Sequence, residues 1–326
     1  MYCTLRLVLL GALAVPAAGY SLAITPLTQV FPAATTRNAM VRVEAGNAAG
    51  FGSGSGTVIA VHPDAAGTGG TICVLTADHV IAPATGAGAY TKIAFGNAGG
   101  GGTVFDSRAD TFTVMRGPMF DTDHRVDLGL IGIRVDDMST LPDINVPFLG
   151  SPRLSHVSNV GGYGLTGTLD GPRRRYNVNE GTYGTFLASF SAWVDQPVYT
   201  FGDYRFEAVH YVTRMGPTDP TVPAIEATGH TLPGDSGGSS WSDEPFTWTV
   251  NGVHSVSSAM RLPDGSRVVP DGSEWYDVRV ASYKDWIDAG CASMVPEPAS
   301  FAVIGIGLLG LLRSRRRASR SDHRIV

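Results

Sequence analysis

The stretch Gly234-Asp-Ser-Gly-Gly238 places one hydroxyl inside a turn made otherwise of glycine and a single carboxylate. Glycine permits backbone conformations and close approaches that a side chain would forbid. Such a turn can aim the backbone N–H groups of Gly234 and Ser236 at one point, which suits the stabilisation of an oxyanion. A serine hydroxyl is a poor nucleophile unless a base takes its proton and a third group orients the base. The turn therefore predicts chemistry only where a histidine and a carboxylate accompany it.

Two other stretches of the chain carry a base and an acid suited to this turn. His79 follows the apolar run Thr71–Leu75, and Asp127 heads a stretch, Leu128–Ile133, that is otherwise apolar or glycine. A carboxylate that faces a buried strand is costly unless it is paired, and a histidine N–H is a suitable partner. Together with Ser236, the two residues would form the unit that activates a serine hydroxyl.

Two nearby aspartates are alternatives for the acid. Asp78 adjoins His79, which directs its side chain elsewhere, and Asp123 lacks the apolar strand that follows Asp127. Asp121 and Asp123 could also join a calcium loop, although a solvated acidic turn is the simpler interpretation. We therefore expect Asp127 to be the partner of His79, and we expect neither a metal site nor a cofactor.

The rest of the body has the pattern of short β-strands. Charged residues are 16% of the 326 residues, glycine occurs 41 times and the net charge is −5, which favours tight turns and disfavours a nucleic-acid partner. Runs of Val, Ile, Thr and Tyr between turn residues predict an all-β sandwich or a pair of barrels. The predicted strands are Thr57–His62, Thr71–Leu75, Ala89–Phe95, Leu128–Arg134, Val198–Phe201, Val209–Val212, Trp248–His254 and Arg267–Val269. One helix is expected at Ser282–Ala289, with Gly290 ending it.

Both ends of the chain carry targeting features. Residues 1–19 combine Arg6, an apolar stretch and small residues, the pattern of a secretory signal peptide. At the other end, Val295-Pro-Glu-Pro298 precedes an apolar segment at 299–312 and a cluster of arginines. Residues 295–326 thereby resemble the PEP-CTERM sorting signal of Gram-negative bacteria. The resemblance implies export across the inner membrane and cell-surface or exopolysaccharide association. It also implies a transmembrane-like tether at 299–312 that an exosortase-type transpeptidase processes; a plain tail anchor is the alternative.

The order of the three motifs resembles the chymotrypsin-type serine peptidases. Leu75-Thr-Ala-Asp-His79, the apolar strand after Asp127 and the turn at 234–238 each match that family, and Val160–Gly164 and Tyr276–Ile287 extend the resemblance. It covers about residues 52–287. The family implies two six-stranded antiparallel Greek-key β-barrels with a short C-terminal helix. The peptidase domain would occupy residues 28–291, with an N-terminal barrel at about 28–150 and a C-terminal barrel at about 151–291.

The same resemblance implies a role for each motif residue. Ser236 would attack the scissile carbonyl, His79 would act as general base and then general acid, and Asp127 would orient His79. The N–H groups of Gly234 and Ser236 would form the oxyanion hole. The expected function is that of an exported serine endopeptidase acting on protein or peptide substrates. The alternative is a catalytically inactive, protease-like binding or matrix protein at the cell surface.

Four residues are expected around the substrate pocket. His230 lies six residues before Ser236, where lysine- and arginine-specific relatives carry an acidic residue. His254, in Gly252-Val-His-Ser255, resembles the histidine with which glutamyl endopeptidases bind an acidic side chain, and Ser255 and Ser257 would lie beside it. The resemblance implies cleavage after Glu or Asp. Simple packing of His254 within its strand is the alternative.

The chain departs from the family pattern at two positions. Ser239 stands where proline is usual, and we expect little effect on chemistry. The Ile-Val-Gly-Gly start is missing, so Asp235 cannot pair with a freed amine; instead, Phe51–Val58 resembles bacterial branches that begin with Gly-Ser-Gly. We expect Asp235 to use an arginine among residues 173–175.

The cysteines leave one question open. Cys3 lies in the expected signal peptide, so Cys73 and Cys291 remain in the body. In an oxidising compartment they could pair, but two buried free thiols would agree equally well with their positions.

Overall fold

The computed structural model describes residues 23–24, 29–30, 38–65, 67–96, 102–151, 158–163, 166–170, 175–179, 187–190, 193–212, 229–231, 233–244, 247–257, 260–261, 267–268 and 274–295. The signal peptide at 1–19 and the apolar segment at 299–312 lie outside these ranges, so both stay predictions. Within the described residues, no helix has the length and apolar character that a membrane span requires.

The first half of the chain folds into one antiparallel sheet of seven strands. Burial follows the sequence pattern, because the apolar strand β5 is buried along its whole length whereas β6 alternates between buried and partly exposed residues. In spatial order the strands are β7 (Val104–Asp106), β6 (Tyr90–Phe95), β3 (Met40–Asn47), β4 (Gly50–Pro63), β5 (Gly70–Thr76), β9 (Gly129–Val135) and β8 (Phe112–Arg116).

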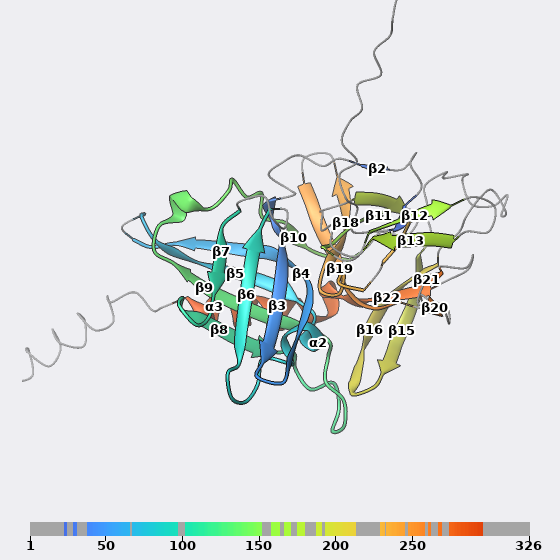
Figure 1. Cartoon of the computed structure of the whole chain (residues 1–326), viewed down its shortest axis with the longest axis horizontal. Coiled ribbons are helices and arrows are strands. Elements are labelled where there is room, and N and C mark those ends of the chain that lie inside the picture. The colour runs from blue at the N-terminus through green and yellow to red at the C-terminus, as the bar shows by residue number, and fades with distance from the viewer. Residues whose placement is uncertain are drawn as a thin grey trace, which may run out of the picture.

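The second half, joined by short strands from earlier in the chain, forms two further sheets, which lie beside the first (Figure 1). The larger one runs in the order β15 (Trp193–Phe201), β16 (Tyr204–Val212), β22 (Glu274–Arg279), β19 (Thr247–Ser257), β18 (Ser239–Glu244), β11 (Ser158–Gly161), β14 (Leu187–Phe190) and β2 (Gln29–Val30), with β10 (Phe148–Leu149) attached to β19. The smaller one runs β17 (Gly229–His230), β1 (Ala23–Ile24), β12 (Thr166–Asp170), β13 (Arg175–Asn179), β21 (Arg267–Val268) and β20 (Met260–Arg261). In the larger sheet, the buried rings of Tyr211 (β16) and Trp275 (β22) stack with their centroids 4.8 Å apart.

These sheets confirm the predicted all-β class with a short C-terminal helix. Every predicted strand coincides with an observed one, although Val269 lies outside the described residues. The first sheet has seven strands and the largest has nine, where six were expected for each barrel, because short edge strands such as β7 and β10 add to them. A 3₁₀ turn, η2 (Met138–Thr140), follows β9 and precedes β10.

The C-terminal helix returns to the first sheet. After the 3₁₀ turn η3 (Val280–Tyr283), α3 (Lys284–Met294) packs against β5 and β9. The expectation that Gly290 ends the helix was wrong, because the helix continues for one more turn. A side chain on Gly290 would clash with Leu130 of β9, so this glycine allows close packing.

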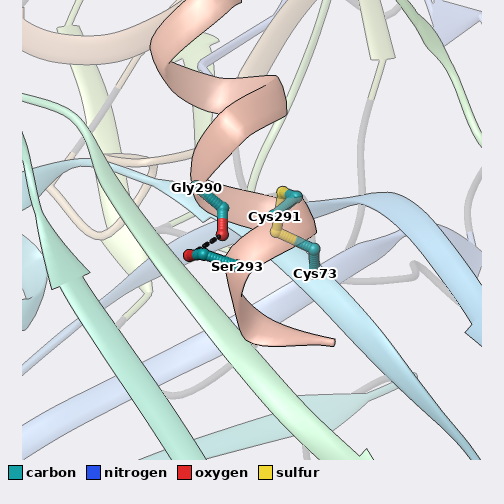
Figure 2. The surroundings of a disulfide bond; sticks show 4 residues. All are labelled: Cys73, Gly290, Cys291 and Ser293. Carbon is teal, nitrogen blue, oxygen red and sulfur yellow. Dashed lines mark hydrogen bonds between the residues drawn. A yellow bond between two sulfur atoms is a disulfide. The ribbon is translucent and has the colours of Figure 1, made fainter. Parts of the chain in front are cut away.

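The residue after Gly290 joins the helix covalently to the sheet. Cys291 of α3 forms a disulfide with Cys73 of β5, with a Cα–Cα distance of 5.7 Å (Figure 2). Of the two alternatives left open by the sequence, the structure therefore contains the pair. The bond fixes the last described element to the strand that leads into His79.

Candidate active site

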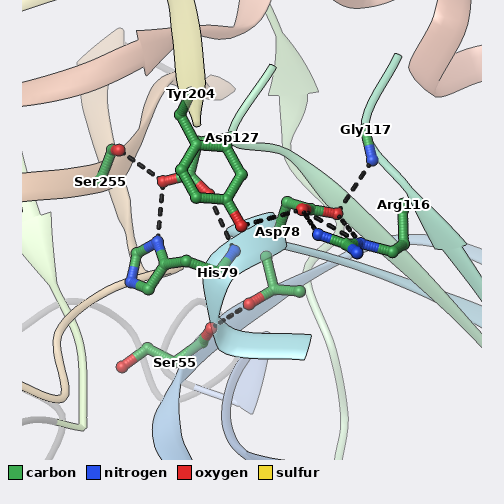
Figure 3. A network of polar contacts seen from close by, with 9 residues as sticks. Ser55, Asp78, His79, Arg116, Gly117, Asp127, Tyr204 and Ser255 are labelled. Atoms are coloured by element: carbon green, nitrogen blue, oxygen red, sulfur yellow. Dashed lines mark hydrogen bonds and ion pairs between the residues drawn. The ribbon is translucent and has the colours of Figure 1, made fainter. Parts of the chain in front are cut away.

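His79 and Asp127 form a short hydrogen-bonded pair in which Asp127 is buried and His79 is partly exposed. His79 lies in α2 (Asp78–Ile81), a single helical turn that follows β5, and Asp127 lies just before β9. The Nδ1 atom of His79 is 2.7 Å from Oδ2 of Asp127, and the backbone N–H of His79 donates to Oδ1 at 2.9 Å (Figure 3). Two bonds to one carboxylate therefore fix both the backbone and the imidazole of His79.

A third donor completes the environment of Asp127. The Ser255 hydroxyl, from β19 of the second half, donates to Oδ2 of Asp127 at 2.5 Å. The Asp127 side chain is fully buried. Burial alone would raise the pKa of Asp127, but the charge of His79 and the bonds from His79 and Ser255 hold it below its ordinary value. Asp127 is thus an ionised acceptor.

The same pair changes the basicity of His79. Burial alone would lower the pKa of His79, but the charge and hydrogen bond of Asp127, with a further contribution from the Asp78 charge, raise it above 6.5. Because Asp127 accepts a hydrogen bond from Nδ1–H, the neutral ring would carry its proton on Nδ1 and present an unprotonated Nε2, the form that a general base requires.

The turn at 234–238 packs against the segment that leads into His79. Gly237 has a φ of +83°, and an added Cβ would lie 2.9 Å from the backbone nitrogen of Ala77. The carbonyl of Ser236 accepts from Ser55 N at 2.7 Å, and the Ser55 carbonyl accepts from Thr76 Oγ1 at 2.7 Å. These contacts bring the turn, β4 and the end of β5 together. They also explain the glycine at 54, because a Cβ there would lie 2.7 Å from the Ser236 carbonyl.

Two backbone donors of the turn have no partner in the part of the chain that the structure describes. The N–H groups of Gly237 and Gly238 donate to the carbonyls of His254 and Asp235, each at 2.8 Å. By contrast, the N–H groups of Gly234 and Ser236 donate to no group among the described residues. Gly234 has a φ of +94°, a conformation that glycine adopts without strain. Both N–H groups could therefore donate to a ligand, as donors of an oxyanion hole must.

The predicted pocket residues separate into different roles. Ser255 bonds to Asp127, so its hydroxyl is engaged there. His254 is buried, and its Nδ1 lies 2.8 Å from Oδ1 of Asp277 in β22. Ser257 is partly buried on the same strand as His254. The backbone of His230 pairs with Ala23 of β1, and its side chain lies outside the described residues.

His254 is the pocket candidate nearest to the turn. Its N–H donates to the Gly238 carbonyl at 2.8 Å, and an added Cβ on Gly238 would lie 3.1 Å from the imidazole Cδ2. The Nε2 atom of His254 is buried and has no partner among the described residues. A buried polar atom without a partner next to a candidate nucleophile is a candidate ligand contact.

Two other positions noted in the sequence, Asp78 and Ser239, each have a hydrogen-bond partner away from His79. Asp78 bonds to the Arg116 guanidinium and the Tyr204 hydroxyl, whereas Asp127 is the carboxylate on His79. Sequence reasoning missed both partners of Asp78, since neither belongs to a recognisable motif. Ser239, in place of the usual proline, shares a hydrogen bond of 2.6 Å with Thr57.

Two further expectations concern aspartates. Asp235 is fully buried, and the predicted arginine side chains at 173–175 lie outside the described residues, so that pairing stays a prediction. Asp121 accepts from the backbone of Asp123 and His124, and its Oδ2 accepts from Arg205 at 3.0 Å. Within the described ranges, no group of three or more acidic, histidine or cysteine side chains could hold a metal ion.

The comparisons with known proteins separate the tail from the body. Residues 295–317 match the family model of the PEP-CTERM protein-sorting motif. The chain therefore carries this sorting motif at its C-terminal end, as the sequence predicted. No curated protein shows significant similarity to the chain.

Solved structures similar to the body are serine protease folds. The scabies mite inactivated protease paralogue S-I1 is 15% identical, with 79% of this chain and 96% of that chain covered and a TM-score of 0.48. The HtrA-type protease AlgW with a tripeptide is 13% identical, with 79% and 61% covered and a TM-score of 0.43. The chain thus spans less than two thirds of that second protein.

Proposed function

We propose that this chain is an exported serine endopeptidase in which Ser236, His79 and Asp127 form the catalytic unit. The observation that carries the proposal is the doubly bonded His79–Asp127 pair, together with the packing of the turn that holds Ser236 against Ala77, two residues before His79. The ionised carboxylate and the base of raised pKa supply what a serine hydroxyl lacks by itself.

The chemistry proceeds in two balanced steps. Ser236 Oγ bonds to the scissile carbonyl carbon while its proton passes to Nε2 of His79. His79 then protonates the leaving amine as the carbon–nitrogen bond breaks, and an acyl-enzyme remains. Water, deprotonated by His79, hydrolyses the acyl-enzyme and regenerates Ser236. The free N–H groups of Gly234 and Ser236 stabilise the oxyanion in both steps.

The sorting motif supports the exported part of the proposal. A PEP-CTERM motif at 295–317 indicates export and association with the cell surface or exopolysaccharide, and it implies processing by an exosortase-type enzyme. Anchoring of the apolar segment at 299–312 in the inner membrane before processing belongs to the same proposal. The peptidase domain at 28–291 would be the functional body.

Peptide hydrolysis by the purified protein tests the reaction. The wild-type chain should cleave unfolded protein substrates, and Ser236→Ala should reduce kcat by about 10⁴-fold or more while leaving the fold intact. A wild-type protein that folds, retains its disulfide and cleaves nothing would contradict the proposal and would favour an inactive binding or matrix protein.

For the substrate class, we propose that His254 selects an acidic side chain before the scissile bond. Asp277 accepts from Nδ1, so a protonated His254 would have only Nε2 left to donate, and Nε2 has no partner among the described residues. A glutamate or aspartate carboxylate of the substrate would give that buried donor an acceptor and a compensating charge. Ser257 lies on the same strand, and His230 would lie on the opposite wall.

A panel of peptides that differ only at the residue before the scissile bond tests this selection. Glutamate should exceed glutamine by about tenfold or more in kcat/KM, equivalent to about 1.4 kcal/mol, and His254→Val should abolish the difference. His62→Val is a matched control, because His62 of β4 also has a buried Nε2 without a partner in the described chain and lies outside the site. Preferential cleavage after lysine or phenylalanine, unaffected by His254→Val, would contradict the assignment.

A further inference from the structure

Beside the His79–Asp127 pair lies a second buried carboxylate, that of Asp78. Asp78 accepts from Arg116 Nε at 2.9 Å, from Gly117 N at 3.2 Å and from the Tyr204 hydroxyl at 3.1 Å, and Arg116 Nη2 completes a bidentate pair (Figure 3). The Asp78 side chain is fully buried, whereas Arg116 is 41% exposed. These donors satisfy the oxygens of the buried carboxylate. Groups on two other elements therefore hold Asp78 in place one residue from His79.

Tyr204 reaches Asp78 from the other half of the molecule. It begins β16, at the turn of the β15–β16 hairpin, while Asp78 and Arg116 belong to the first half. The hairpin turn is bonded to the first half by its backbone: Arg125 N donates to the Asp203 carbonyl at 2.9 Å, and Arg205 N donates to the Arg125 carbonyl at 3.0 Å. Arg125 precedes Asp127 by only two residues, so the hairpin and Asp127 are held in one bonded segment.

The Tyr204 ring lies beside the His79–Asp127 pair. Its centroid lies 6.3 Å from that of His79 at an interplanar angle of 65°, an edge-on contact. Figure 3 shows the ring beside Asp127, with its hydroxyl directed to Asp78. Burial and the charges of Asp78 and Asp127 raise the pKa of Tyr204, so the hydroxyl stays a neutral donor. One aromatic side chain therefore lies beside His79 and bonds to the carboxylate that precedes it in the chain.

We propose that Tyr204 is a positioning residue for His79. Tyr204 excludes water from the His79–Asp127 pair and holds Asp78 and Arg116 in place beside it. The inference rests on the proposed function and extends it, because it makes the base of one half depend on a hairpin of the other. Tyr204 itself does not touch the reacting atoms.

The ring and the charge should affect His79 in opposite directions. Burial lowers the pKa of His79, so Tyr204→Ala, which admits water, should raise it; the Asp78 charge raises that pKa, so Asp78→Asn should lower it. The charged or titratable groups that act on His79 are Asp127, with its donor Ser255, and Asp78, with its donors Arg116 and Tyr204. If the contact were merely structural, Tyr204→Ala and Asp78→Asn would not shift the pKa of His79 in opposite directions.

The experiment combines an NMR titration with steady-state kinetics on the full chain. The His79 imidazole is titrated in a Ser236→Ala background, with its signal assigned by its loss in His79→Gln, so this measurement does not need activity. In the active chain, Tyr204→Ala should lower kcat by about 10- to 100-fold and move the acid limb of kcat/KM to higher pH. Tyr204→Phe keeps the ring but loses the hydrogen bond to Asp78, so its kcat should lie between those of wild type and Tyr204→Ala.

Phe201→Ala is the matched control. Phe201 pairs with Tyr204 across the same hairpin and is 47% exposed. The substitution therefore removes an aromatic ring without exposing more of His79. Unchanged His79 titration and kcat in Tyr204→Ala, or equal losses in Tyr204→Ala and Phe201→Ala, would overturn the proposal. If Tyr204→Ala does not fold, Tyr204→Leu carries the same expectations on a smaller scale. A wild-type chain that cleaves nothing would refute the proposed function, whereas the titration would still decide the role of Tyr204.

Discussion

Breaking the Cys73–Cys291 disulfide is expected to destabilise the protein by several kcal/mol. The bond joins residues separated by 218 positions, and the loop-entropy relation for a crosslink of that span gives about 5 kcal/mol at 25 °C, as an upper estimate. Because domains are stable by only about 5–15 kcal/mol in total, this loss is a large share of the whole. The corresponding fall in Tm is about 10–20 °C for a domain of this size.

Denaturant unfolding can separate the crosslink from the packing of the two cysteines. Wild-type protein is unfolded with and without dithiothreitol, and the Cys73→Ala/Cys291→Ala variant is unfolded under the same two conditions. Reduction should lower the free energy of unfolding of the wild type by the amount that the crosslink contributes. It should leave the free energy of unfolding of the variant unchanged. The variant should be slightly less stable than reduced wild type, because both side chains are buried and their truncation leaves cavities.

Hydrogen exchange gives the local readout. The disulfide anchors α3 to β5, and Met294 at the end of α3 packs on Gly132 of β9. Reduction should therefore weaken amide protection first in α3. A change below about 1 kcal/mol on reduction, or two free thiols in the exported protein, would refute this account of how the helix is held.

Three further predictions concern the site itself. The kcat/KM of the wild-type protein should rise with pH through a midpoint above 6.5, because His79 acts only when neutral and its pKa is raised. The lowered pKa of Asp127 keeps that residue ionised throughout. A midpoint below 6.5 would contradict the pairing. Ser255→Ala should lower kcat by about 10- to 100-fold, since a hydrogen bond to a charged group contributes about 1.5–3 kcal/mol. Gly237→Ala should abolish activity and lower the free energy of unfolding by at least about 2 kcal/mol, because its positive φ disfavours a side chain and the new Cβ would clash with Ser55.

Two matched variants control the substitutions. Ser240→Ala removes a buried serine hydroxyl that has no partner among the described residues, so kcat should be unchanged. Gly67→Ala introduces a side chain at a φ of +72° where nothing lies within 4 Å, so it should cost only about 1–2 kcal/mol of backbone strain. Equal effects of Ser240→Ala and Ser255→Ala, or of Gly67→Ala and Gly237→Ala, would refute the assigned contacts.

Much of the fold could be predicted because local patterns decide it. The apolar run at Thr71–Leu75 and the stretch after Asp127 became the buried strands β5 and β9, which pair with each other. A carboxylate at the head of a buried strand needs a hydrogen-bond donor, and this requirement predicted that Asp127 pairs with His79. The structure has that bond at 2.7 Å. These inferences needed only neighbouring residues and the cost of an unpaired buried charge.

The rest depended on contacts between residues far apart in the chain. The Ser255 hydroxyl bonds to a residue 128 positions away, and Tyr204 bonds to one 126 positions away. Neither residue lies in a motif that reveals such a partner. Gly290 was read as a helix stop because glycine favours that position, whereas close packing on Leu130 determines its place. Tertiary packing, which local patterns do not contain, decided each of these.

The central claim is that His79 and Asp127 activate Ser236. Treatment of the folded, disulfide-bonded protein with a fluorophosphonate, followed by peptide mapping by mass spectrometry, tests it most directly. The account predicts one adduct per chain, located on Ser236, with a labelling rate at least about 10³-fold lower in His79→Ala and in Asp127→Asn. No adduct on the folded wild-type protein, or labelling of Ser236 that does not depend on His79, would contradict it.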